Sequence, residues 1–160
     1  MLVFGKETAY WKEKFGGIFL GFIFFILVYL INPEFEKWKE FAKEIPSIGM
    51  STFGFLLVLL GIILQGNSKT IEWMKSRDEL FQRFISFNKK IVMRSVLLSS
   101  YALFFVYFDL KWITGYFTNG IFIYEIISQF SIPILTFLLV WFLYDVIYFI
   151  TIFYLLIKRS

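Results

Sequence analysis

The chain has 160 residues, 59% of them hydrophobic, with a mean hydropathy of +0.72, which predicts an integral membrane protein in contact with a lipid bilayer rather than a soluble domain. It contains no cysteine and no histidine, which excludes thiol and imidazole catalysis and the usual zinc, haem and iron-sulfur ligands, so no metal and no cofactor is expected. The net charge of +4 fits contact with anionic lipid, and no nucleic-acid binding is expected because no basic patch carries interleaved base-reading groups.

Four apolar stretches predict a single all-α transmembrane domain over residues 1–160, with spans at 16–31, 48–64, 91–108 and 132–157. The first two are near the lower limit, since a hydrocarbon core of about 30 Å needs about 20 helical residues. The first stretch ends at Pro33, which stops the helix. The fourth stretch begins at residue 121 and is too long for one untilted span, so Pro133 predicts a separate outer, interfacial or kinked section over 121–131.

Two connecting segments have helical periodicity. In "PEFEKWKEFAKEI" the apolar Phe35, Trp38 and Phe41 share one face, so this segment is expected to lie flat on the outer membrane surface. Residues 70–88 predict a cytosolic amphipathic helix between the second and third spans. Both helices can simply cover span ends, or the cytosolic helix can be a docking face for a soluble protein partner. The contact residues in that second interpretation are Lys75, Arg77, Phe81, Arg83 and Phe84.

The distribution of basic residues predicts the orientation. Twelve of the sixteen Lys and Arg residues lie in the N-terminal segment, in the middle loop with the start of the third span, and at the C-terminus. The other four are Lys37, Lys39, Lys43 and Lys111. By the positive-inside rule, both termini are expected on the cytoplasmic side of the inner (plasma) membrane.

Small residues mark helix faces that can approach another helix closely. The pairs that share a face are Gly17 with Gly21 in the first span, Gly54 with Gly61 in the second, and Ser95 with Ser99 in the third. Each face can pack within the chain or form a seam between copies. Because at least one such face has no evident partner in a single chain, a homo-oligomer is expected, as a dimer or tetramer.

Asp145 is the one carboxylate in the apolar run "LVWFLYDVIYFI" and is expected near mid-membrane. An ionisable residue in a span is a functional hypothesis by default, here either a helix-joining contact or a pore or proton-linked group. Ser99, Ser100 and Tyr101 lie at a similar predicted depth, so their hydroxyls are the expected partners. Arg94 is expected to extend to the inner headgroups, unless a helix tilt brings it to Asp145.

Catalysis is not expected. An intramembrane aspartyl protease needs two carboxylates at one depth, and the other aspartate of a span, Asp109, is expected about 10 Å away in depth and lacks the Gly-x-Gly-Asp context. A serine hydrolase without histidine would need a Ser-Lys pair, and none of the predicted spans contains lysine. The sequence therefore predicts a protein that is not an enzyme.

About a third of the chain carries a resemblance, in the block "GFLLVLLGIILQGNSKTIEWMKSRDELFQRFISFNKKIVMRSVLLSSYALFF". Its short second span, "GNSKTI" turn, basic amphipathic helix and serine-containing third span resemble the layout of small four-span proteins of phage-defence loci, such as the Rex exclusion membrane protein and the Kiwa membrane subunit. The resemblance implies an inner-membrane protein that senses or executes an antiviral, abortive-infection type response. The resemblance also implies that such a protein acts as an oligomer that depolarises the cell, or recruits a cytosolic effector.

Two other functions compete with this one. An accessory membrane protein of the bacteriocin-immunity type would have the same size and spans, and neighbouring genes would separate the two. A small ion channel or transporter should show an internal repeat with broken helices at corresponding positions, and the sequence has one Pro-interrupted segment, at Pro133.

Overall fold

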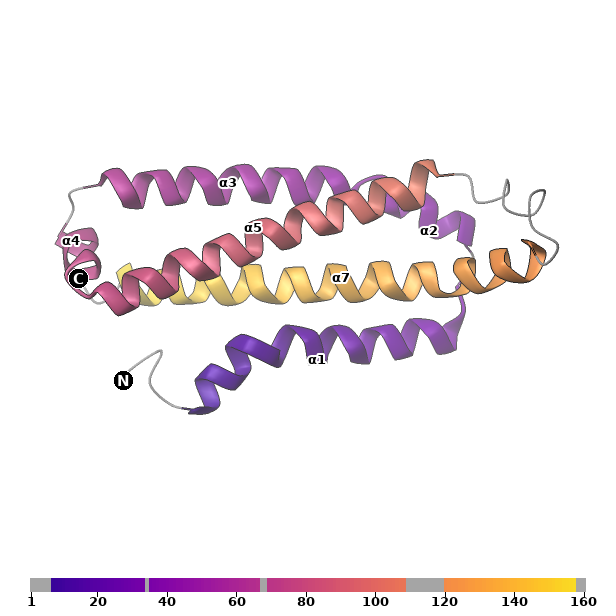
Figure 1. The fold of residues 1–160 in the computed structure, drawn as a ribbon, viewed down its shortest axis with the longest axis horizontal. Helices are drawn as coiled ribbons and strands as arrows, with labels where there is room; N and C mark the ends of the chain where they lie inside the picture. Colours follow the sequence, from indigo (N-terminus) through magenta and orange to yellow (C-terminus); the bar gives the residue numbers. More distant parts are fainter. Residues whose placement is uncertain (1–6, 34, 67–68, 109–119, 158–160) are drawn as a thin grey trace.

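The computed structural model describes residues 7–33, 35–66, 69–108 and 120–157 (Figure 1). The regular elements in these ranges are all helices: α1 Glu7–Ile31, α2 Phe35–Ala42, α3 Ile45–Gln65, α4 Lys69–Lys75, α5 Asp78–Tyr107 and α7 Gly120–Ile157. Within the described ranges, the stretches long and apolar enough to cross a membrane are Trp11–Ile31, Lys37–Gln65, Phe81–Tyr107 and Ile126–Tyr154. The predicted all-α fold with four transmembrane helices is confirmed, and the chain is a multi-pass membrane protein.

The ends of the first helices have local causes. Asn32 adopts a left-handed backbone conformation with φ of 46°, and its N–H donates to the carbonyl of Val28 at 3.0 Å. Asparagine tolerates this conformation better than most residues, and Pro33 follows it, so α1 stops here as the sequence predicts. Pro46 lies in the first turn of α3, where its missing N–H costs no helical hydrogen bond.

The single cytosolic helix expected over residues 70–88 is divided in two. Arg77 has φ of −112° and ψ of 79°, which is not helical, and it separates α4 from α5. The Ser76 hydroxyl donates to the carbonyl of Trp73 at 2.7 Å, and the carboxylate of Asp78 lies at the positive end of α5. From there α5 runs through the third span without a break. The connector is therefore the short α4, and residues 78–88 are the first turns of a spanning helix.

The fourth apolar stretch is one helix rather than an outer section followed by a span. α7 has 38 residues and is about 57 Å long, with Pro133 inside it. The proline is fully buried, and polar contacts surround it: the Ser131 hydroxyl donates to the carbonyl of Ile127, and the Tyr101 hydroxyl on α5 donates to the carbonyl of Ser131 at 3.2 Å. Packing of this kind lets a membrane helix continue past a proline.

The long helices form an open row in the order α3, α5, α7, α1 (Figure 1). Among these four, contacts are extensive between α3 and α5, between α5 and α7, and between α7 and α1. The start of α1, the short α4 and the end of α7 lie at one end of the molecule, and α2 lies at the other. The row is not closed into a bundle, so each long helix keeps a large exposed apolar face.

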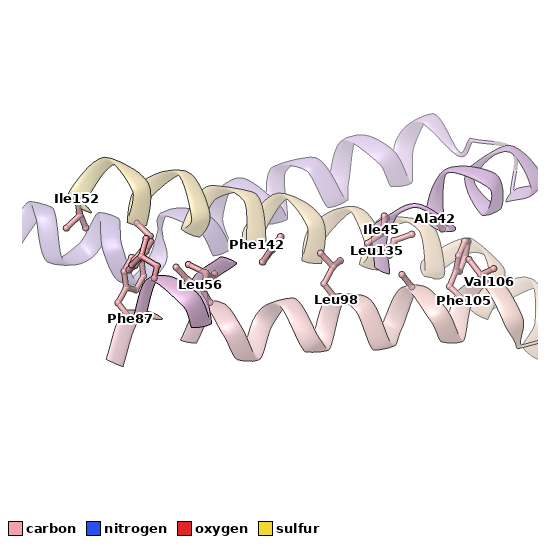
Figure 2. Close-up of a cluster of buried hydrophobic side chains, with 14 of the residues drawn as sticks. Ala42, Ile45, Leu56, Phe87, Leu98, Phe105, Val106, Leu135, Phe142 and Ile152 are labelled. Carbon is pink, nitrogen blue, oxygen red and sulfur yellow. The ribbon is translucent and has the colours of Figure 1, made fainter. Parts of the chain in front are cut away.

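The buried apolar side chains form a band along the length of the helices, from Ile152 at one end to Phe105 and Val106 at the other (Figure 2). Leu98 of α5 and Leu135 of α7 lie in its middle and are fully buried. α2 packs against α3, α5 and α7, as expected of a helix that covers the ends of spans.

Candidate functional site

The buried aspartate of α7 is paired with an arginine of α5. The Asp145 carboxylate forms an ion pair with the Arg94 guanidinium, and the two side chains are 1% and 21% exposed. Arg94 Cζ also lies 4.2 Å from the ring centroid of Trp141, one helical turn before Asp145 on α7. The guanidinium is therefore held by a carboxylate and by an aromatic face, two interactions that suit a planar cation.

The pair is the alternative that a helix tilt offered for Arg94, and it replaces the hydroxyl partners expected for Asp145. Arg94 does not extend to the headgroups, because the crossing of α5 over α7 brings it to Asp145 (Figure 1). An unpaired carboxylate in a span is costly because the surroundings cannot solvate it, and the pair removes the net charge. The site is thus a neutral, buried joint between two helices.

The hydroxyls expected to bind Asp145 point elsewhere. Ser99 is buried against Gly49 of α3, Ser100 is exposed, and Tyr101 donates to Ser131. Ser99 is five residues beyond Arg94 and so lies about 140° further around α5, on another face. Tyr101 shares the face of Arg94 but lies about 10 Å further along the helix. The predicted hydroxyl partners are therefore wrong in direction or in depth.

A polar hollow that the sequence did not predict adjoins the ion pair. It has a volume of about 230 Å³ and is lined by Glu13 and Lys14 of α1 and by Phe87, Lys90 and Arg94 of α5. Glu13 Oε2 lies 4.0 Å from Nη2 of Arg83, so the start of α1 also meets the start of α5 through charges. Glu13 lies one helical turn before Gly17, the first residue of the glycine pair of α1. This position next to a close-packing face was the sequence feature that could have indicated a charged contact here.

The sequence also missed Asn88, which is 1% exposed at the contact of α5 with α3. Its side-chain amide donates to the carbonyl of Leu56 at 3.3 Å. Ser95 and Ser99 lie seven and eleven residues further on the same face, and a Cβ on Gly49 would lie 3.2 Å from the carbonyl of Ser95. The buried polar strip of α5 therefore contacts α3 and does not line an open path.

The glycine pair of α1 packs within the chain. A Cβ added to Gly17 would lie 2.6 Å from Cδ1 of Trp141, and one added to Gly21 would lie 3.0 Å from the backbone oxygen of Phe137. α1 therefore approaches α7 closely through these two positions, as small-xxx-small pairs allow. This contact also packs α1 against Trp141, the residue whose ring lies against the Arg94 guanidinium.

The glycine pair of α3 has an open surface instead. A Cβ added to Gly54 or to Gly61 would meet none of the described residues of other helices within 4 Å. Leu56, Leu59 and Ile63 are buried on the opposite side of the same helix. The Gly54 and Gly61 face, called here the open glycine face, therefore points away from the rest of the chain.

The five predicted docking residues do not form one exposed surface. Phe84 is 3% exposed, and its ring lies 5.0 Å from that of Phe149. Phe81 is partly buried against the core, and Arg83 faces Glu13. Because α5 is continuous from residue 78, this segment is part of a spanning helix and its apolar face packs on the end of α7. Phe84 is buried in that contact, so its prediction as a docking residue is wrong.

The two remaining docking candidates have local partners as well. Lys75 Nζ donates to the carbonyls of Leu64 and Gly66, at 3.0 and 3.2 Å. These carbonyls have no helical partner at the end of α3, so Lys75 caps that helix. Arg77 Cζ lies 4.8 Å from the ring centroid of Trp73, and Arg77 and Lys75 are the exposed members of the set.

Some sequence-based expectations fall outside the described residues, namely those on Asp109 and Lys111 and on three of the basic residues that predict the orientation, Lys6, Lys158 and Arg159. Within the described ranges, no group of three or more acidic residues is placed to hold a metal ion. No family model matches the chain, and neither the curated proteins nor the solved structures give a match. The fold and the ion pair together define a multi-pass α-helical membrane protein in which an ion pair joins two of the spans.

Proposed function

We propose that the protein is an inner-membrane component of an antiviral, abortive-infection type defence system, and that it works as an oligomer acting as membrane effector, sensor or anchor for a cytosolic partner. The defence context is supported by the resemblance of residues 54–105 to the layout of small four-span proteins of phage-defence loci. Cytoplasmic termini are supported by the basic flanks, because the start of α1, α4 and the end of α7 share one end of the molecule (Figure 1).

The open glycine face carries the oligomeric part of the proposal. In a membrane, helices associate by close packing, and small residues allow their backbones to approach. Among the described residues, a Cβ added to Gly54 or Gly61 would have no neighbour from another helix within 4 Å, although the corresponding pair of α1 is filled by aromatic side chains of α7. A second copy that presents the same face would fill this space and give a two-fold dimer, the simplest closed assembly.

Ion conduction is the second candidate function, supported by the position of the Arg94 and Asp145 pair beside the polar hollow. The buried polar strip of α5 is packed against α3, so a path through one chain has no continuous polar wall among the described residues. Conduction would therefore run between copies, and it depends on the oligomer.

The experiment compares the wild type with Gly54→Leu/Gly61→Leu and with the control Ile62→Phe. Ile62 is exposed and lies about 100° around α3 from Gly61, so the control adds bulk beside the open glycine face. Mass in lipid nanodiscs, plaque formation by a phage panel and membrane potential during infection are measured at matched expression. The double variant should insert normally but become monomeric and lose protection, whereas the control should keep both.

Two outcomes would contradict the proposal separately. A monomeric double variant that still protects would remove the oligomer from the mechanism. A wild-type protein that protects against no phage, when expressed with its neighbouring genes, would remove the defence function and leave the assembly result standing.

A further inference from the structure

A groove of about 480 Å³ follows one face of α5. Its lining residues on α5 recur every three or four positions, which is the spacing of a single helix face. They are Ser86, Lys89, Lys90, Met93, Arg94 and Leu97, and Trp141 of α7 completes the wall. The groove shares Lys90 and Arg94 with the polar hollow that α1 and α5 enclose.

The groove changes from polar to apolar along its length. Lys89 and Lys90 lie at the end nearest the start of α5, and both are exposed. Met93 and Leu97 lie one and two turns further into the span, and they are 60% and 51% exposed. The distance from Lys90 to Leu97 along the helix is about 10 Å. An occupant that fits needs a polar end near the lysines and an apolar end beside Leu97 and Trp141.

The polar end carries net positive charge. Arg94 is balanced by Asp145, whereas neither Lys89 nor Lys90 has a carboxylate within ion-pair distance among the described residues. Glu13 is the acid whose charge acts on Lys90, and it acts on Arg83 as well. One carboxylate therefore faces two cations, Lys90 and Arg83, and Lys89 adds a third positive charge beside them, so an added anion would be attracted.

We propose that this groove binds an anionic phospholipid of the leaflet next to the start of α5, with its phosphate between Lys89 and Lys90 and an acyl chain along Met93, Leu97 and Trp141. The charge complementarity and the order of polar and apolar residues match a lipid molecule standing in that leaflet. The site is on α5 and not on the open glycine face of α3, so it does not depend on the proposed function.

The test uses the full chain in nanodiscs of phosphatidylcholine, titrated with phosphatidylglycerol of the same acyl chains, and reads bound lipids by native mass spectrometry. Each lysine near an anionic lipid contributes about 1 kcal/mol, so Lys89→Gln/Lys90→Gln should weaken phosphatidylglycerol binding by about 30-fold, at about 1.4 kcal/mol per factor of ten. The control Lys12→Gln/Lys39→Gln removes the same charge outside the groove and should keep the wild-type affinity. Leu97→Trp fills the apolar end and should reduce binding without changing charge.

Equal loss of affinity in the two lysine pairs would overturn the proposal, because attraction would then reflect net charge and not this groove. Competition by inorganic phosphate or glycerol phosphate at the affinity of the lipid would also overturn it, since the acyl chain would be irrelevant. Wild-type binding in Leu97→Trp would contradict the acyl-chain placement in the same way.

Discussion

Arg94 of α5 and Asp145 of α7 form their ion pair at the contact that joins the two halves of the row. α3 packs extensively on α5, and α1 packs extensively on α7, so the molecule consists of two helix pairs. The contact of α5 with α7 connects these pairs. An ion pair in this position makes the relative placement of the halves depend on two charges.

The first prediction concerns the stability of this joint. Removing one partner of a buried ion pair costs about 3 to 5 kcal/mol in soluble proteins, because a charge is left unpaired. Arg94→Gln should cost more than Asp145→Asn, since Asp145 is the more buried partner and Arg94 keeps the ring of Trp141. The double variant Arg94→Gln/Asp145→Asn should recover most of the loss, because two amides can hydrogen-bond. Thermal unfolding in nanodiscs measures all three, and additive losses would show that the two side chains do not interact.

The four spans could be predicted because apolar length alone decides which segments cross a bilayer. The sequence offered Arg94 as the partner of Asp145 only for a tilted helix, because depth along straight helices leaves out the crossing of α5 over α7, which is a property of their packing. The wrong prediction for Phe84 has the same cause. A periodic apolar stripe shows that one face of a helix is apolar, but it does not show whether α7 or a second protein covers that face.

The two glycine pairs show which feature of the packing could not be predicted from the sequence. Gly17 with Gly21 and Gly54 with Gly61 give comparable sequence signals of small residues on one face. Trp141 and Phe137 of α7 fill the first pair, and nothing within the described chain fills the second. The difference depends on which helix lies adjacent, and this is decided by the packing of the whole row.

The second prediction follows from the close approach of α1 to α7. A Cβ at Gly21 would meet the backbone oxygen of Phe137 at 3.0 Å, and a backbone atom cannot rotate away. Gly21→Leu should therefore separate α1 from α7 and lower stability by about 1 to 3 kcal/mol, as overpacking does. Gly54→Leu is the matched control and should leave the unfolding of the monomer unchanged. Equal unfolding midpoints for the two variants, measured by thermal unfolding in mild detergent, would mean that α1 is not held through this position.

The third prediction concerns Asn88, whose amide donates to the carbonyl of Leu56 across the contact of α3 with α5. Hydrogen bonds of this type contribute about 0.6 to 2 kcal/mol in membranes, and an apolar side chain of similar size restores much of the packing. Asn88→Leu should therefore change stability by less than about 1 kcal/mol. Asn88→Asp should be strongly destabilising, because it buries a carboxylate without a cation against α3. Unfolding by denaturant in mixed micelles distinguishes them, and wild-type stability in the Asn88→Asp variant would mean that water reaches this contact.

The last prediction separates the structural role of the ion pair from a functional one, and it rests on the proposed function. The double variant Arg94→Gln/Asp145→Asn keeps the shape of Asp145 and a polar, hydrogen-bonding side chain at both positions, but it has no charge to move or titrate. If the pair only joins α5 to α7, this variant should insert, assemble and protect as the wild type does. If the charges take part in an ion-conducting or switching step, assembly should persist while depolarisation and protection during phage challenge are lost. We expect the second result, because a neutral contact would join the helices at a lower desolvation cost than an ion pair.

Membrane potential and survival are measured at matched expression, with Asn88→Leu as the control for a changed polar contact elsewhere on α5. Full protection by the neutral pair would leave Asp145 and Arg94 as structural residues and would remove the main support for conduction.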